Sequence, residues 1–150
     1  MSIRNHTLLE LDEFLPYRLS LLSNTVSAAI ASSYVERFKL TIPEWRIMAV
    51  LGRFPGITAG TVARRTAMDK VAVSRALARL QSAGYLRRKG DKTDRRRSLL
   101  QLSAAGDRLY QRIAPLAMDF ENQLLDSLTE RDRRHLDRLL TQLMERAREL

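Results

Sequence analysis

Cysteine is absent from the 150-residue sequence, and histidine is scarce. The first absence excludes disulfide bonds, thiolate metal ligands and redox sensing by a cysteine. The two histidines, His6 and His135, lie far apart, and neither has a second ligand-type residue at the spacing of a metal site. We therefore expect neither a metal nor a cofactor.

Long apolar runs are missing as well. No stretch approaches the roughly 20 apolar residues that a membrane-spanning helix requires. Acidic residues stand near the N-terminus, where a signal peptide would need an apolar run. We therefore expect a cytoplasmic protein without a membrane partner. A chain of this length suits one hydrophobic core better than two, so residues 1–150 are predicted to form a single domain.

The sequence also lacks the residue patterns of catalysis. It offers no nucleophile beside a base, no acid–base pair and no glycine-rich loop that would cradle a phosphate. His6 stands near the chain end, and His135 lies among charges of mixed sign. These absences predict that the protein is not an enzyme.

What is present is a concentrated positive charge. The net charge is +9, and residues 58–103 hold 12 Lys and Arg against 3 Asp and Glu. Residues 1–57 hold 6 against 5, and residues 104–150 hold 8 against 9. A localised basic stretch indicates a polyanionic partner. A solvated charged surface without any ligand is the alternative that the charge pattern leaves open.

Both ends of the chain have apolar residues at steps of three and four, the spacing that lines one face of a helix. They predict a helix over about residues 16–38 and further helices after Ala104. The central part is too small to cover both apolar faces, so residues 1–40 and 104–150 are predicted to be the dimerisation helices of a symmetric homodimer. The apolar residues are Leu11, Leu15, Leu19, Leu22, Val26, Ile30, Leu109, Ile113, Leu116, Phe120, Leu136, Leu139, Leu140 and Leu143.

Three shorter helices are predicted in the middle of the chain. The first has Thr41 as its cap and ends at Pro55. The next two begin at Thr58 and stop at Gly84, and the turn at 67–69 joins them into a helix-turn-helix.

The second helix of this pair is predicted to read DNA. Its exposed residues are expected to be Lys70, Ala72, Ser74, Arg75 and Arg79, whereas Val71, Leu77 and Leu80 are expected to pack inward. An arginine suits guanine, and a serine suits a base or a phosphate. Ordinary solvated helix residues remain the alternative at each position.

A hairpin is predicted after Gly84, because residues 85–89 and 98–103 have the length of strands and flank a polar segment. Arginine on a narrow extension suits the minor groove of DNA. A flexible basic loop without a specific target is the alternative. The cations of this hairpin are Arg87, Arg88, Lys89, Lys92, Arg95, Arg96 and Arg97.

The predicted fold class is mainly α (α+β). A winged helix-turn-helix with a two-stranded β wing would occupy residues 41–103, between N- and C-terminal helices that form a dimerisation region.

Four motifs in order resemble the MarR family of bacterial transcriptional regulators. They are T-x-x-x-V-A from Thr58, D-K-x-x-V-S-R-x-L-x-x-L from Asp69, the wing signature D-x-x-D-x-R from Asp91, and L-x-L-S-x-x-G ending at Gly106. The tripeptide at 84–86 is also similar to the family's entry into the wing. Each motif alone is weak, but their order and spacing are specific.

The resemblance implies a triangular homodimer with interlocked terminal helices and two lobes that enter successive major grooves of double-stranded DNA at a palindromic operator. It implies that Ser74 and Arg75 occupy recognition-helix positions. It also implies that Asp94 and Arg96 form a salt bridge in the wing, with Arg96 in the minor groove. Lys92 departs from the family, since many members have proline there, and peroxide sensing by cysteine is not carried over.

The complete predicted DNA-binding set combines the helix-turn-helix and the wing. It comprises Thr58, Lys70, Ala72, Ser74, Arg75, Arg79, Arg88, Asp94, Arg95, Arg96 and Arg97.

Many members of this family are repressors released by small aromatic or phenolic acids, which bind between the dimer helices and the lobe. Arg18, Trp45 and Arg46 are predicted to form such a site, with guanidinium groups for a carboxylate and an aromatic wall. Core packing is the alternative for Trp45.

The predicted function is sequence-specific regulation of transcription by a repressor that a small aromatic acid releases. The alternative is an architectural protein that binds DNA through charge alone, without sequence preference.

Overall fold

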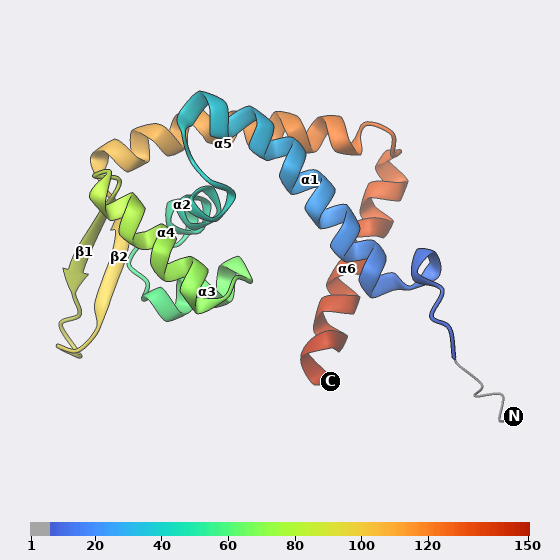
Figure 1. Ribbon diagram of the computed structural model, residues 1–150, viewed down its shortest axis with the longest axis horizontal. Helices are drawn as coiled ribbons and strands as arrows, with labels where there is room; N and C mark the ends of the chain where they lie inside the picture. The colour runs from blue at the N-terminus through green and yellow to red at the C-terminus, as the bar shows by residue number, and fades with distance from the viewer. Residues whose placement is uncertain (1–6) are drawn as a thin grey trace, which may run out of the picture. The chain divides into compact units, whose positions relative to one another are not determined.

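The computed structural model describes residues 7–150, apart from the side chains at positions 34 and 35. His6 lies outside the described residues. The predicted order of helices and hairpin is confirmed (Figure 1). The elements are η1 (Leu11–Glu13), α1 (Leu15–Phe38), α2 (Ile42–Arg53), α3 (Ala59–Thr66), α4 (Lys70–Ser82), β1 (Leu86–Gly90), β2 (Ser98–Leu102), α5 (Ala104–Leu125) and α6 (Glu130–Glu149).

Two compact units share the chain, and their boundary falls inside α5. The first comprises Met1–Tyr110 and the second Gln111–Leu150. The first unit contains the helix-turn-helix and the hairpin. Along residues 7–150 no helix is long and apolar enough to cross a membrane.

Side-chain caps fix where the central helices begin. Thr41 forms a capping box on α2, in which its hydroxyl accepts from the Glu44 N–H and the Glu44 carboxylate accepts from the Thr41 N–H at 2.6 Å. Thr58 caps α3 by accepting from the Thr61 N–H, and Asp69 caps α4 by accepting from the Ala72 N–H. Both threonine caps confirm the sequence prediction.

The core of the first unit lies between α2, α3, α4 and β2. Its fully buried side chains include Ile47, Met48 and Leu51 of α2. Helix α4 contributes one buried stripe, whose residues follow one another at steps of three, one and three. These residues are Val73, Ala76, Leu77 and Leu80. Packing of this stripe on α2 fixes which side of α4 faces solvent.

The prediction that Val71 packs inward is wrong, because its side chain is 60% exposed. Val71 and Leu80 are nine residues apart, which is two and a half turns at 3.6 residues per turn, so they lie on opposite faces of the helix. Val73 supplies the apolar contact that was assigned to Val71. Ala72, expected to be exposed, is half-buried.

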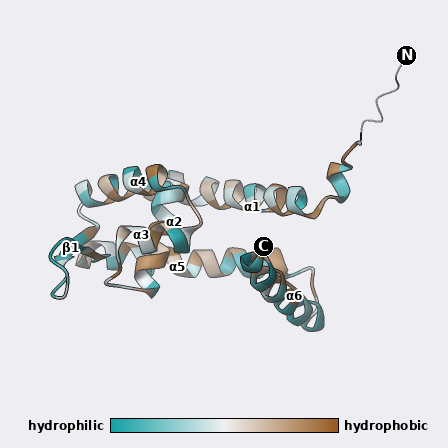
Figure 2. Cartoon of the chain, turned by 90° about the horizontal axis from the view of Figure 1, so that it is seen from below, coloured by the Kyte–Doolittle hydropathy of each residue, from teal (hydrophilic) through white to brown (hydrophobic). Residues whose placement is uncertain are grey.

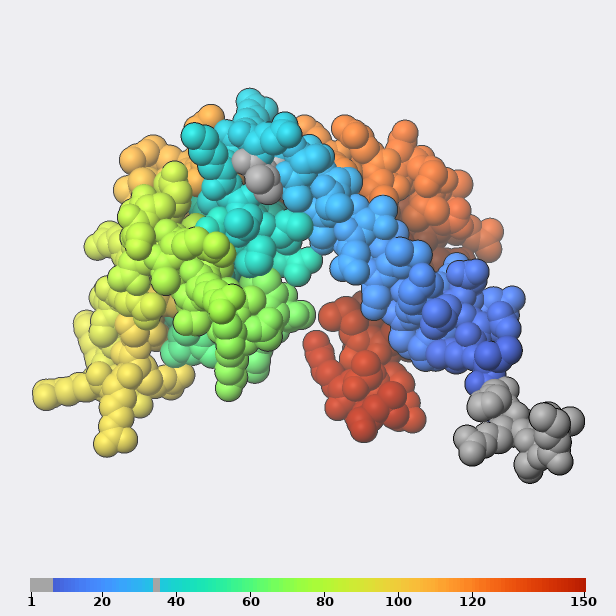
Figure 3. Space-filling model, in the orientation of Figure 1, coloured from blue at the N-terminus to red at the C-terminus, as the bar shows by residue number. Residues whose placement is uncertain are grey.

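The wing is an antiparallel pair in which Leu86 faces Leu102 and Gly90 faces Ser98. Leu100 of β2 also exchanges backbone hydrogen bonds with Ile57, the residue that precedes the cap of α3. This third pairing joins the base of the wing to the start of the helix-turn-helix. Figure 2 shows the turn beyond β1 in the hydrophilic colour, and Figure 3 shows the wing, in yellow, projecting from the unit.

A second junction joins the end of the wing to the end of α4. The Ser103 hydroxyl donates to the Gly84 carbonyl at 2.6 Å and accepts from the Gly106 N–H at 3.1 Å. The Ser103 N–H donates to the carbonyl of Tyr85 at 2.9 Å. Backbone atoms therefore approach so closely that a Cβ on Gly106 would overlap the Tyr85 carbonyl oxygen.

The second unit has its own internal connection. Thr129 caps α6 by accepting from the Asp132 N–H. The Arg133 guanidinium donates through Nη2 to the Leu125 carbonyl at 2.9 Å, which joins the end of α5 to the start of α6. No residue of α6 is buried.

Candidate nucleic-acid interface

The outward face of α4 carries the residues that were predicted to read DNA. Ser74 and Arg75 are exposed there, on the same stripe as Val71 and Ala78, because these four residues follow steps of three, one and three. This outward stripe is the counterpart of the buried stripe, displaced by two residues. Lys70 is exposed beside it, in the first turn of the helix.

Arg79 has a structural role that the sequence did not reveal. Its Nε lies 3.1 Å from Oε1 of Glu44, whose side chain is only 8% exposed. A buried carboxylate requires partners for its charge, and Glu44 has two: Arg79 and the N–H of Thr41. The ion pair therefore holds α4 against the beginning of α2, while the Arg79 side chain remains 58% exposed.

A surface hollow of about 280 Å³ lies between α3 and α4. It brings together three residues of the predicted DNA-binding set, Lys70 and Ser74 of α4 and Arg88 of β1. Arg88 is fixed there because its Nε donates to Oε1 of Gln81 at 2.8 Å. Thr58 is half-buried, and its hydroxyl is engaged with Thr61 as the helix cap.

The wing turn exposes three consecutive arginines, Arg95, Arg96 and Arg97. The expected salt bridge between Asp94 and Arg96 is wrong for this structure. Instead, Oδ1 of Asp94 accepts from the backbone N–H of Arg96 at 2.9 Å. A short aspartate side chain at the start of a turn accepts from the backbone N–H two residues further on, so the Asp94 carboxylate stabilises the turn itself.

Asp91 stabilises the same turn in the same way. Its Oδ1 accepts from the Thr93 N–H at 2.9 Å and from the Thr93 hydroxyl at 2.7 Å. These hydrogen bonds, the backbone one first, hold the pKa of Asp91 below its ordinary value. Both aspartates of the wing signature therefore shape the turn that presents the arginines.

Sequence reasoning missed a pair of cations beside the helix-turn-helix. The Arg65 guanidinium lies 3.7 Å from the centre of the Phe54 ring, and that of Arg53 lies 4.9 Å from it. Such cation–π contacts restrain long side chains. The neighbouring pair Arg53-Phe54 is visible in the sequence, but the approach of Arg65 from α3 requires the fold.

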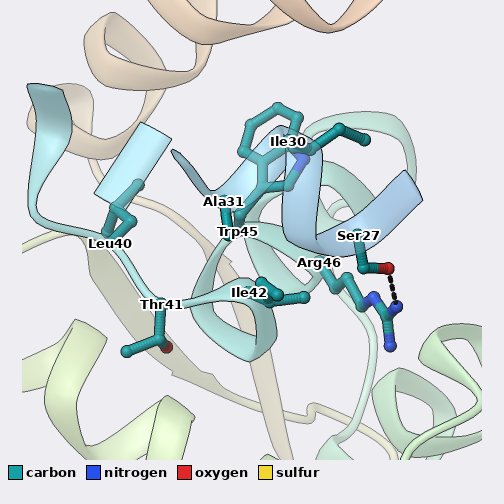
Figure 4. A pocket seen from close by; sticks show the side chains of 8 residues that line it. All are labelled: Ser27, Ile30, Ala31, Leu40, Thr41, Ile42, Trp45 and Arg46. Carbon is teal, nitrogen blue, oxygen red and sulfur yellow. Dashed lines mark hydrogen bonds between the residues drawn. The ribbon is translucent and has the colours of Figure 1, made fainter. Parts of the chain in front are cut away.

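Two of the three predicted ligand-binding residues line one pocket, of about 100 Å³, between α1 and α2 (Figure 4). Arg46 donates through Nη2 to the Ser27 hydroxyl at 2.9 Å, and Trp45 also stacks on Tyr110 at 6.1 Å between ring centres. Trp45 thus combines pocket lining with packing. The pocket residues are Ser27, Ile30, Ala31, Leu40, Thr41, Ile42, Trp45 and Arg46.

The structure does not bring Arg18 to this pocket. Arg18 lines a separate open groove along α1, together with Asp12 and Tyr17. The predicted three-residue site therefore reduces to Trp45 and Arg46. Among the described residues there is no cluster of three potential metal ligands.

Comparison with known proteins gives matches to regulators of transcription. A family model described as "MarR family" matches residues 38–97. The transcriptional regulator HosA of Escherichia coli O157:H7 is 25% identical over 105 residues, which are 70% of this chain and 78% of HosA.

Solved structures with the same fold include a MarR/EmrR family transcriptional regulator from Acinetobacter sp. ADP1. It has a TM-score of 0.87 and 25% identity, and the match covers 95% of this chain and 100% of that one. The PcaV transcriptional regulator of Streptomyces coelicolor, in complex with its natural ligand, has a TM-score of 0.77 and 22% identity over 95% of this chain and 99% of that one.

Proposed function

We propose that the chain, whose residues 38–97 match a MarR family model, is a MarR-family repressor that binds a palindromic operator in double-stranded DNA as a homodimer. The observation that carries this proposal is the outward stripe of α4, which exposes Ser74 and Arg75 directly opposite the stripe that anchors the helix. The wing beside it exposes three arginines.

The roles differ between the two elements. Arg75 suits a bidentate contact with guanine in the major groove, and Ser74 suits a base edge or a phosphate. Lys70, Arg79 and Arg88 suit phosphates, as does the N-terminus of α3 at Thr58. Ala72 is half-buried, and its short side chain leaves room for the backbone of α4 to approach the DNA closely. The wing arginines suit the minor groove, with Asp94 shaping the turn that presents them.

Exposed apolar side chains at both ends of the chain support the homodimer. Leu19 and Leu22 of α1 are 43% and 57% exposed, and Leu139 and Leu143 of α6 are 48% and 44% exposed. Soluble monomers rarely leave large apolar patches uncovered. We assign residues 1–40 and 104–150 to the dimer interface, and residues 41–103 to the DNA-binding lobe.

Removal of single side chains tests the assigned roles. Arg75→Ala is expected to weaken operator binding by roughly 1–3 kcal/mol for each lost bidentate contact, with little effect on random DNA. Arg96→Ala is expected to weaken both, and most strongly where the flanks are rich in A·T, because a narrow minor groove attracts arginine. Asp94→Ala is expected to act in the same direction as Arg96→Ala, through the lost turn.

The measurement is fluorescence anisotropy at one salt concentration, with operator, random duplex and an operator carrying G·C flanks. Arg138→Ala removes the same charge from α6 and serves as the control. Equal losses on operator and random DNA for Arg75→Ala would contradict base reading. If the wild-type protein showed no preference at all, the alternative of charge-only architectural binding would hold.

We also propose that a small aromatic acid releases the protein from DNA by binding the pocket at Trp45 and Arg46. The lining is largely apolar, and Arg46 supplies the one positive charge among the pocket residues. A dry cavity of about 150 Å³ takes one benzene ring, so a pocket of about 100 Å³ that opens to solvent suits a single-ring ligand.

A charged and a neutral ligand of the same shape test this pocket. Benzoate and its hydroxylated derivatives are expected to release the operator, whereas benzamide is not, because only the acids carry a carboxylate for Arg46. In Arg46→Ala the concentration for half-release is expected to rise at least tenfold, while operator affinity without ligand stays near wild type. Arg18→Ala is the control, expected to respond as wild type. If the acids released Arg46→Ala from the operator at the same concentration as the wild-type protein, the assignment of this pocket as the ligand site would be contradicted.

A further inference from the structure

Val71 is the one large apolar side chain on the outward stripe of α4. It lies in the first turn of the helix, is 60% exposed, and shares its stripe with Ser74 and Arg75. The buried stripe is completed by Val73, so the packing of α4 does not use Val71. The preceding Asp69 caps the helix, and its side chain accepts a hydrogen bond from the N–H of Ala72.

Exposure alone assigns nothing, since single apolar residues are common on protein surfaces. The position of Val71 is what distinguishes it. Residues near the N-terminal end of a recognition helix are those that approach base edges. The major groove presents hydrogen-bonding groups at every base pair, and its apolar group is the C5-methyl of thymine. The side chain that suits this methyl group is a small apolar one.

We propose that Val71 is a specificity-determining residue that contacts the C5-methyl group of a thymine in each operator half-site. This inference rests on the proposed DNA-binding function and extends it. Valine holds a single preferred rotamer in a helix, so little side-chain freedom is lost when the contact forms. Apart from Arg75, the other members of the stripe, Ser74 and Ala78, are small and allow the helix to approach the base edges closely.

The spacing on the helix places the thymine relative to the guanine read by Arg75. Four helical residues rise about 6 Å, and successive base pairs of B-DNA are about 3.4 Å apart. The thymine contacted by Val71 therefore lies within about two base pairs of that guanine.

The experiment begins with a selection of duplexes from a random library by the wild-type homodimer. Each thymine of the enriched sequence is then replaced by deoxyuridine, which removes only the methyl group. At one thymine per half-site the replacement is expected to weaken wild-type binding roughly fourfold, and about fifteenfold when both half-sites are changed. Val71→Ala is expected to bind the thymine and uracil duplexes equally.

Arg75→Ala is the control that separates this role from general damage to the interface. It is expected to weaken binding while keeping the wild-type ratio between thymine and uracil duplexes. An enriched sequence whose uracil forms all bind as tightly as the thymine form, or an unchanged ratio in Val71→Ala, would overturn the role of Val71 alone. A selection that enriches no sequence would overturn sequence-specific binding itself, and with it this inference.

Discussion

Replacement of Leu139 and Leu143 by arginine is expected to convert the homodimer into a monomer. Both side chains lie on one face of α6 and are about half exposed in the single chain. Burial of a leucine side chain contributes about 1.5–3 kcal/mol, and a charged guanidinium in an apolar interface lacks a partner. Neither leucine belongs to the buried core formed by α2, α3, α4 and β2, so the first unit is expected to fold as before.

Loss of the dimer is expected to weaken operator binding by at least a hundredfold. Two linked lobes bind two half-sites with an avidity that exceeds that of one lobe by 10²–10⁴. Sedimentation velocity gives the mass of the protein, and anisotropy gives its affinity for a full operator and for a single half-site. Affinity for the half-site is expected to change little.

A matched variant isolates the apolar face from the added charge. Thr141 and Gln142 lie on the polar side of α6, and their replacement by arginine adds the same charge to the same helix. That protein is expected to remain a dimer. If the variant with arginine at Leu139 and Leu143 also sedimented with the mass of a dimer, the assignment of α6 to the dimer interface would be contradicted.

Local features of the sequence were sufficient to predict the order of the elements. The caps Thr41 and Thr58 act within three residues of themselves, and the turn at 67–69 is closed by the αL conformation of Ala67 and the cap of Asp69. The motifs that carry the family resemblance are contiguous as well. The mainly helical winged fold is therefore confirmed, and a MarR family model matches residues 38–97, which contain three of the four motifs.

Features that depend on packing between elements were predicted less well. The wrong face for Val71 is a separate case, because the spacing already decided it: Val73 stands four and seven residues before Leu77 and Leu80 and shares their face, whereas Val71 does not. The ion-pair partner of Arg79 is Glu44, 35 residues earlier in the chain, and no local sequence pattern predicts that pair. Arg18 was grouped with Arg46 by residue type, whereas the fold places them on different surface hollows.

The same substitution at two glycines is expected to change stability in opposite directions. Gly106→Ala is expected to lower the free energy of unfolding by about 3 kcal/mol, because overpacking against fixed atoms forces the backbone to shift. The new Cβ would overlap the Tyr85 carbonyl oxygen, and that oxygen already accepts the Ser103 N–H at 2.9 Å. The carbonyl cannot move away without loss of this hydrogen bond at the junction of α4, the wing and α5.

Gly60→Ala is the matched control and is expected to raise the free energy of unfolding by about 0.5–1 kcal/mol, since alanine is the better residue inside a helix. Its Cβ would meet only Nη1 of Arg64 at 3.8 Å and Oγ1 of Thr58 at 3.9 Å, which are ordinary contacts. Urea denaturation followed by circular dichroism gives both midpoints. Destabilisation of similar size in the two variants would contradict the assignment of Gly106 to a close backbone approach, because a general intolerance of alanine at glycine positions would then explain both.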